Sequence, residues 1–348
     1  MRAPLEALRR RAGWAPLPWG LDLLLTDACN LRCSYCPMGA GVDPGRPRRF
    51  VETAKAIAFL DSIAWFRPMV RLFGGEPLLH PEWRRILEAA VARGLPVTLV
   101  TNGTLLRGLA DDLVRSGILA VGISIDPPNA NDRHRGEGVF AACADAVAAL
   151  AAARERHGTP TPAIEIYTTV HGESYSDLAA WAERLAGWGV DTLRLQHLMW
   201  LSPARRAASE ALIRSAIGDA SFFRAEVEEF CTEAMPPIDG AVLAAQLDAL
   251  QSRGHPFRLE IEPPLPVDET VAFYLDPEFR RRTARACTLI STYAFVDPAG
   301  RLYPCLTLDM GDVFARPFAE VWNGAKFRAY RRLLLREGRL PLCDRCPS

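Results

Sequence analysis

The sequence predicts an α/β fold in which six parallel strands and their helices precede a small α+β region. Apolar, β-rich runs alternate with helical patterns across 21–198. The runs are apolar on both faces, as in parallel strands that helices cover. Polar or glycine-rich segments directly follow the first four runs, where the carboxyl ends of parallel strands meet. A right-handed series of such units curls into a partial (β/α)6, TIM-like barrel.

The expected elements follow one another in regular order. The six strands are expected at 21–25, 69–73, 96–101, 119–125, 164–170 and 192–198. The first helices are expected within 51–66, 81–94, 105–117 and 139–158, and several of these patterns end in a glycine suited to a helix C-cap. We divide the chain into an N-terminal extension, the barrel, a helical linker region and a C-terminal domain, at 1–20, 21–200, 201–256 and 257–348.

Composition excludes several classes of function. The 41 basic side chains balance 41 acidic ones, so we expect no capture of nucleic acid. Residues 1–20 are basic but lack the apolar stretch of a signal peptide, and we expect no membrane span. These features predict a cytoplasmic protein. In that compartment the nine cysteines are more often metal ligands or catalytic thiols than a disulfide framework.

Chemically distinctive residues follow four strands, and we expect them at one rim. Cys29, Cys33 and Cys36 follow the first strand, in a loop without a nearby histidine or fourth cysteine, whereas zinc prefers four ligands. Three thiolates at this spacing can converge on one iron–sulfur cluster. The other three rim segments contribute Gly74, Gly75, Glu76, Asn102, Ser124 and Asp126.

The loop sequence CNLRCSYC resembles the signature of the radical S-adenosylmethionine (SAM) superfamily, and the resemblance covers roughly 21–198. It implies a 4Fe–4S cluster with one iron free of protein ligands. In that family the amine and carboxylate of SAM chelate this iron. The reduced cluster of that family cleaves SAM to methionine and a 5′-deoxyadenosyl radical, which takes a hydrogen atom from the substrate. A protein such as flavodoxin or ferredoxin would supply the electron.

The same resemblance assigns the rim residues to SAM. The backbone of Gly74, Gly75 and Glu76 would receive the methionine ammonium, and Tyr35 would lie near adenine. Ser124 and Asp126 would contact the carboxylate or ribose, with Asn102 as a further contact. The alternatives are that GGEP forms an ordinary turn and that Ser124 and Asp126 cap the following helix.

A second group of thiols closes the chain. Cys287 and Cys305 bracket an expected hairpin, with DPAG as its turn, and Cys343 and Cys346 follow in CDRC. Four thiols can fully ligate a metal centre, either iron–sulfur or zinc.

This spacing resembles the SPASM/twitch extension of radical SAM enzymes, over about 257–348, in its shorter twitch version. The resemblance implies a second, auxiliary 4Fe–4S cluster. With four cysteines it would have no open iron, which favours electron transfer to or from a substrate radical.

Substrate-facing residues are expected on the later strands. Arg194 and Gln196 share one strand face that we expect to point into the barrel, and Tyr167 is similarly placed on the preceding strand. The alternative is that Arg194 pairs with a carboxylate from a neighbouring strand.

Three functions compete. The first is hydrogen abstraction from a small molecule of natural-product, sugar or aminocyclitol type, with the auxiliary cluster taking the second electron. The second is modification of a ribosomally synthesised peptide; because only 28 residues precede Cys29, this would need a separate recognition partner. The third is a non-catalytic iron–sulfur or zinc protein, which would not cleave SAM.

Overall fold

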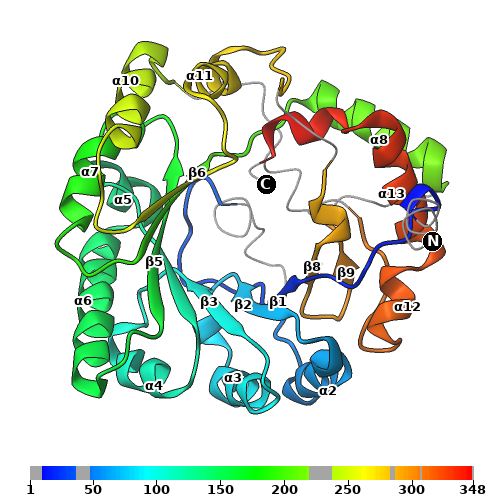
Figure 1. Cartoon of the computed structure of the whole chain (residues 1–348), viewed down its shortest axis with the longest axis horizontal. Helices are drawn as coiled ribbons and strands as arrows, with labels where there is room; N and C mark the ends of the chain where they lie inside the picture. Colours follow the sequence, from blue (N-terminus) through cyan, green and yellow to red (C-terminus); the bar gives the residue numbers. More distant parts are fainter. Residues whose placement is uncertain (1–9, 37–47, 219–236, 283–286, 306–307, 347–348) are drawn as a thin grey trace, which may run out of the picture.

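A single nine-stranded sheet forms the centre of the protein, in the order β7-β6-β5-β4-β3-β2-β1-β8-β9. The computed structural model describes residues 10–36, 48–218, 237–282, 287–305 and 308–346. The strands curve into an arc with α2, α3, α4 and α6 outside it, and α12 and α13 lie on the opposite side of the molecule from α6 (Figure 1). This is the expected partial barrel, extended at both edges.

The six expected strands are all present and pair in parallel with their neighbours in sequence. Their bounds are β1 Gly20–Thr26, β2 Met69–Gly74, β3 Val97–Thr101, β4 Ala120–Ser124, β5 Ala163–Val170 and β6 Thr192–His197. Both faces of β1 are buried along its whole length. One face of β1 therefore points into the barrel lumen, and the other packs under the helices.

The helices between these strands bury one apolar stripe each against the sheet. Phe59 and Leu60 of α2, Leu87 of α3 and Leu150 of α6 are all at most 2% exposed. The helices here are α2 Thr53–Ile63, α3 Trp83–Ala92, α4 Ala110–Arg115, α5 Pro128–Arg135, α6 Val139–His157 and α7 Leu178–Leu185.

A seventh parallel strand extends the sheet beyond the six that the sequence predicts. β7, Arg258–Glu262, pairs with β6 after the helices α8, Pro203–Ile217, and α10, Gly240–Gln251. Its sequence RLEIE lacks an apolar run because alternate residues are charged. Glu260 and Glu262 lie in register with Arg194 and Gln196, so the strand is held by charge pairing as well as by apolar burial.

The C-terminal hairpin joins the other edge of the sheet. β8, Tyr293–Val296, pairs in parallel with β1 and antiparallel with β9, Leu302–Tyr303. The predicted DPAG turn is confirmed: Gly300 has φ +81° and its N–H donates to the Asp297 carbonyl at 2.9 Å. The helices of this part are α11 Val267–Leu275, α12 Phe318–Trp322 and α13 Ala325–Glu337.

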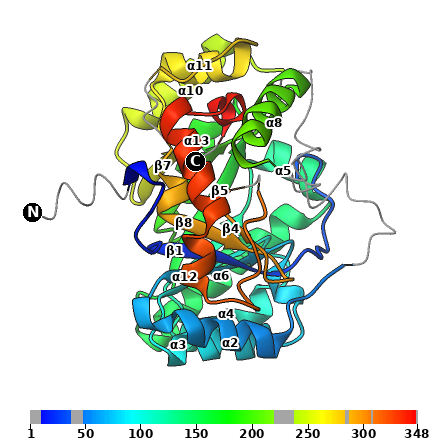
Figure 2. The same ribbon diagram turned by 90° about the vertical axis from the view of Figure 1, so that its right-hand side faces the viewer.

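The segment before β1 fastens the C-terminal helices to the barrel. Trp322 Nε1 donates to the Pro16 carbonyl at 2.7 Å, and Asn323 exchanges two hydrogen bonds with the Ala15 backbone, each of 3.0 Å. Figure 2 shows α12 and α13 running along this side of the molecule. The C-terminal cysteines are thus carried by elements that pack onto the barrel.

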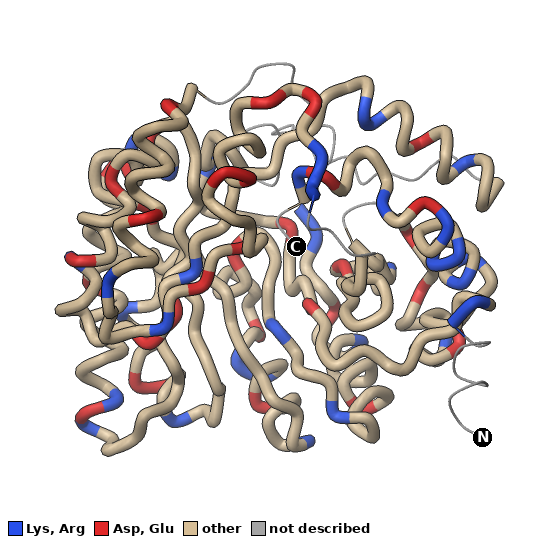
Figure 3. The backbone as a smooth tube through the Cα atoms, turned by 45° about the horizontal axis from the view of Figure 1, so that its top comes forward, with Lys and Arg blue, Asp and Glu red and all other residues tan. Residues whose placement is uncertain are grey.

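Basic and acidic residues, which are equal in number, are interspersed along the chain (Figure 3). In the part of the chain that the structure describes, no single helix has the length and hydropathy to cross a membrane; α5 and α6 pass that test only as a pair, bent by 113°.

Candidate active site

The cysteine loop leaves the carboxyl end of β1 and brings three thiols near one another. Burial raises the pKa of Cys33 to about 11; the charge of Arg135 opposes this, and Cys36 and Cys29 lie close enough to raise the pKa further. Cys29 Sγ accepts a hydrogen bond from Leu31 N at 3.4 Å. Soft thiolates that face one another in this way fit a cluster with three protein ligands.

A site for a single metal ion would need ligands that converge more closely than those of an iron–sulfur cluster. Among the described residues, no three His, Cys, Asp or Glu side chains gather tightly enough to hold a single metal ion. In an iron–sulfur cluster each thiolate binds its own iron, so the ligands need not meet at one point.

The glycines after β2 hold the cysteine loop by close backbone contact. Gly75 N donates to the Thr26 carbonyl and Glu76 N to the Ala28 carbonyl, both at 2.8 Å. A Cβ at Gly74 would lie 2.3 Å from Thr26 O, and one at Gly75 would lie 2.2 Å from Ala28 O. Only glycine fits at these two positions, because any side chain would clash with the main chain of Thr26 or Ala28. The sequence did not reveal this role.

Glu76 joins the ends of β2 and β3. Its buried carboxylate accepts hydrogen bonds from Thr101 Oγ1 at 2.8 Å, Asn102 N at 2.7 Å and Leu78 N at 3.1 Å. Burial raises the pKa of Glu76, and these three bonds oppose the rise. The side chain of Asn102 then reaches the cysteine loop, donating to Asn30 Oδ1 at 2.8 Å and to Cys29 Sγ at 3.7 Å.

Asp126, after β4, binds the cysteine loop from the other side. Its fully buried carboxylate accepts hydrogen bonds from the Tyr35 hydroxyl, from Arg135 Nε at 2.9 Å and from Thr169 N at 2.8 Å. Burial alone would raise the pKa of Asp126, but the charge and hydrogen bond of Arg135, together with His171 and the hydrogen bond of Tyr35, outweigh it and the pKa is lowered. Asp126 thus fixes the orientation of Tyr35.

The helix-capping alternative for Ser124 and Asp126 does not match the geometry. α5 begins after Pro127, and no side chain caps it. The Asp126 carboxylate contacts Tyr35, Arg135 and Thr169, and the Asp126 main-chain N–H donates to Asn131 Oδ1 of α5 at 3.0 Å. Ser124 is half-buried at the end of β4. Contact of either side chain with SAM stays a prediction.

Two histidines, His134 and His171, complete this rim. His134 Nδ1 lies 2.6 Å from Ser34 Oγ, and its ring packs at 4.4 Å from the ring of His171, which follows β5. Burial lowers the pKa of His171 to about 4, so this residue is neutral at pH 7. The only sequence signal for His171 was its place directly after a strand.

The barrel lumen contains a charge network centred on Arg194. Its Nη1 lies 2.6 Å from Glu262 Oε1, it also contacts Glu260, and its Nη2 lies 3.6 Å from Glu165 Oε2. Pairing with carboxylates of neighbouring strands, the alternative for Arg194, is therefore what the structure shows. β7 supplies two of these carboxylates, and it was not among the predicted strands.

The other two lumen residues from the sequence join the same network. Gln196 Nε2 donates to Glu262 Oε2 at 3.2 Å, and the Tyr167 hydroxyl donates to Glu165 Oε2 at 3.1 Å. The Arg194 guanidinium also lies 5.3 Å from the centre of the Tyr167 ring. Arg194, Gln196 and Tyr167 thus belong to one network; their contact with a substrate stays a prediction.

The four C-terminal cysteines come together at a second place. Burial raises the pKa of Cys343 well above its usual value, and Cys346, Cys305 and Cys287 are all close enough to raise it further. The Tyr330 hydroxyl lies 3.8 Å from Cys305 Sγ. Four thiols gathered around Cys343 suit a fully ligated iron–sulfur cluster.

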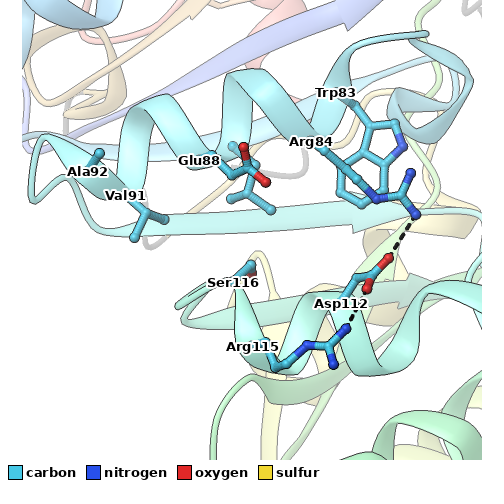
Figure 4. Close-up of a pocket in the computed structure, with 9 residues that line it drawn as sticks. Trp83, Arg84, Glu88, Val91, Ala92, Asp112, Arg115 and Ser116 are labelled. Carbon is cyan, nitrogen blue, oxygen red and sulfur yellow. Dashed lines mark hydrogen bonds and ion pairs between the residues drawn. The ribbon is translucent and has the colours of Figure 1, made fainter.

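A concavity on the outer surface is separate from both thiol groups. It lies between α3 and α4, and Asp112 pairs there with Arg84 at 2.9 Å and with Arg115 at 2.8 Å (Figure 4). Because it opens on the helical layer outside the sheet, it has no part in the chemistry at the strand ends.

Two family models match the two parts of the chain that carry these thiols. The model described as the radical SAM superfamily matches residues 23–185, and an iron–sulfur cluster-binding domain of SPASM type matches 287–347. The chain belongs to the radical SAM superfamily. It is an enzyme whose cofactors are SAM, a SAM-binding 4Fe–4S cluster and an auxiliary iron–sulfur cluster. The assignment of individual cysteines to these clusters stays a prediction.

Individual proteins are similar over most of this radical SAM chain. An AdoMet-dependent heme synthase of Methanosarcina barkeri is 26% identical over 328 residues, which cover 92% of this chain and 86% of that protein. The crystal structure of Streptococcus suis SuiB bound to S-adenosylmethionine has a TM-score of 0.66 at 13% identity, covering 94% of this chain and 70% of that one.

A third similar structure is anSMEcpe with bound AdoMet and a peptide. It has a TM-score of 0.54 at 16% identity and covers 88% of this chain and 81% of that one. At these identities the two structures establish the fold alone.

Proposed function

We propose that this radical SAM enzyme abstracts a hydrogen atom from a polar small molecule, of natural-product, sugar or aminocyclitol type, and that the auxiliary cluster then accepts one electron. The observation that carries the proposal is the charged layer in the lumen. Arg194, Gln196 and Glu262 lie in the barrel toward the carboxyl ends of β6 and β7 and are partly exposed. Such groups recognise hydroxyl, amine or carboxylate substituents of a compact substrate.

Each part of the chain would have a defined task. Cys29, Cys33 and Cys36 would hold the first cluster, and the backbone after β2 would receive the amino group of SAM. Tyr35, fixed by Asp126, would flank the adenine. When bound, the cluster and SAM supply reductive cleavage to methionine and a 5′-deoxyadenosyl radical, with the electron coming from a donor such as flavodoxin or ferredoxin. The barrel side chains would orient the substrate and exclude water.

The C-terminal cysteines would serve the second half of the oxidation. Loss of a hydrogen atom leaves a substrate radical. To become a closed-shell product, the radical must release one further electron and a proton. Four thiolates from Cys287, Cys305, Cys343 and Cys346 leave no iron open to bind substrate, which favours electron acceptance there.

A second candidate is modification of a ribosomally synthesised peptide with the help of a recognition partner. SuiB has been solved bound to its precursor peptide SuiA, and anSMEcpe with a peptide, which favours this alternative. The heme synthase, whose similarity spans 92% of this chain, is named for a small-molecule product. We place the small molecule first for this reason and because of the charged lumen.

Deuterium transfer distinguishes the two substrate classes. The reconstituted protein is incubated anaerobically with dithionite, SAM and extracts of cells grown in heavy water, separated into small-molecule and peptide fractions. We expect deuterium in 5′-deoxyadenosine only with the small-molecule fraction. The Cys29→Ala, Cys33→Ala, Cys36→Ala variant is the matched control and should yield none. Deuterium from the peptide fraction alone would contradict the proposal and support the alternative.

A further inference from the structure

Arginines lie near the C-terminal thiols, and one of them binds the main chain of the segment that carries two of the cysteines. Arg281 Nε donates to the main-chain carbonyl of Asp344 at 3.0 Å, and Asp344 lies in the segment between Cys343 and Cys346. Burial lowers the pKa of Arg281, and the nearby thiols of Cys346 and Cys343 oppose that shift. A guanidinium remains charged in such surroundings, so its positive charge lies beside these two thiols.

A second arginine, Arg339, directly precedes Leu340, whose carbonyl accepts a hydrogen bond from Cys343 N at 2.9 Å. Burial raises the pKa of Cys287, Cys346 raises it further, and the positive charge of Arg339 opposes the rise. Arg339 also lies near Arg281, because it contributes to lowering the pKa of Arg281. Arg281 and Arg339 therefore bring two positive charges to one set of four thiols.

Two further arginines nearby have other tasks. Arg345 donates to the Phe273 carbonyl at 2.9 Å and to the Asp276 carbonyl, and its guanidinium lies 3.8 Å from the centre of the Trp200 ring. Arg205 forms an ion pair with Asp344 Oδ2 at 3.0 Å. These contacts direct the two charges to α11 and to Asp344, whereas the charges of Arg281 and Arg339 act on the thiols.

A cation at this place favours one redox state of a cluster. A four-iron cluster with four thiolate ligands is negatively charged, and reduction adds one more negative charge. Nearby positive charge stabilises the reduced state more than the oxidised one, and burial limits screening by solvent. Protein charge and hydrogen bonding around a cluster are among the factors that set its reduction potential.

We propose that Arg281 and Arg339 are positioning residues that raise the reduction potential of the auxiliary cluster and so make it an electron acceptor during turnover. The inference rests on the proposed function, in which the substrate radical gives one electron to this cluster and a proton to solvent. The substrate thus loses two electrons on the way to product: the first leaves with the hydrogen atom, and the second goes to the cluster. A protein of the flavodoxin or ferredoxin class would reoxidise the cluster between turnovers.

The test measures the midpoint potential of the auxiliary cluster in the full chain. Cys29→Ala, Cys33→Ala and Cys36→Ala remove the first set of thiols, so that iron binds only at the C-terminal set. In this background Arg281→Gln should lower the equilibrium constant for reduction about tenfold, which is a shift of about 59 mV to more negative potential. Arg281→Lys, which keeps the charge, should stay close to the parent. Electron paramagnetic resonance at a series of poised potentials gives these values.

Arg336→Gln is the matched control, because Arg336 is an exposed arginine of α13 that pairs with Glu337. Its potential should equal that of the parent. If Arg281→Gln does not bind iron, Arg339→Gln takes its place with the same expected shift. An unchanged potential in an iron-loaded Arg281→Gln or Arg339→Gln protein would overturn the inference.

The same experiment separates this inference from the proposed function. A parent that holds zinc rather than a reducible cluster at these cysteines would overturn the electron-acceptor role, and the inference with it. A reducible parent cluster whose potential ignores Arg281 and Arg339 would overturn the inference alone.

Discussion

Replacing Gly75 by alanine tests whether backbone contact between β2 and the cysteine loop holds the first thiol site. An added Cβ would lie 2.2 Å from Ala28 O and 2.6 Å from Ala28 C. The two segments would have to separate by about 1 Å to restore ordinary contact. The hydrogen bonds from Gly75 N to Thr26 O and from Glu76 N to Ala28 O would weaken as they did so.

The expected cost combines these two effects. Overpacking of a closely packed site costs about 1–3 kcal/mol, and two weakened hydrogen bonds add about 1–2 kcal/mol. Gly75→Ala should therefore lower the free energy of unfolding by about 2–5 kcal/mol, measured by urea denaturation. It should also lower the iron content after reconstitution, because the thiols of the loop move with Ala28.

Gly108→Ala is the matched control. A Cβ at Gly108 meets nothing within 4 Å, and the residue does not have a positive φ. Its stability should be unchanged or higher by up to about 1 kcal/mol. The reasoning is refuted if Gly75→Ala unfolds at the same urea concentration as Gly108→Ala and binds as much iron.

Three further predictions concern charged groups. Asp126→Asn leaves buried Arg135 without its counter-charge and should cost about 3–5 kcal/mol in urea denaturation, so a loss below about 1 kcal/mol would count against this account. Arg194→Met leaves the lumen carboxylates without their cation and should lower the free energy of unfolding by about 2–3 kcal/mol. Adding Glu262→Gln should restore part of this loss. Additive losses in the double variant would show that Arg194 and Glu262 do not interact. Burial, aided by the charge of Arg281, lowers the pKa of His197 to about 3. The unfolded chain therefore takes up a proton first, and the free energy of unfolding falls as pH drops from about 6.5 to about 3, by up to about 1.4 kcal/mol per pH unit. His197→Gln should flatten this slope, and equal slopes in the two proteins would contradict the prediction.

The sequence was sufficient for features that depend on local pattern. β1 and β4 are short apolar runs, and parallel pairing places Cys29, Gly75 and Asp126 at the same end of the sheet whatever the details of packing. The hairpin around Gly300 followed in the same way from its turn residues.

Features that depend on partners distant in sequence were not accessible. β7 was missed because its inward-facing Glu260 and Glu262 break the apolar pattern, and both pair with Arg194 on the adjacent strand, a partner that lies far away in sequence. The three hydrogen bonds on Asp126 join the cysteine loop, α5 and β5, which no single stretch of sequence brings together. Arg281 lies in a stretch for which no motif was predicted, and its place beside Cys346 appears only in three dimensions.

The central claim is that this chain holds two iron–sulfur clusters and generates a radical from SAM. The most direct measurement is anaerobic reconstitution with quantification of iron, sulfide and zinc, followed by dithionite reduction with SAM and an assay for 5′-deoxyadenosine. We predict about eight irons per chain and formation of 5′-deoxyadenosine. A protein fully loaded with iron that forms no 5′-deoxyadenosine, even when both extract fractions are present, would contradict the claim.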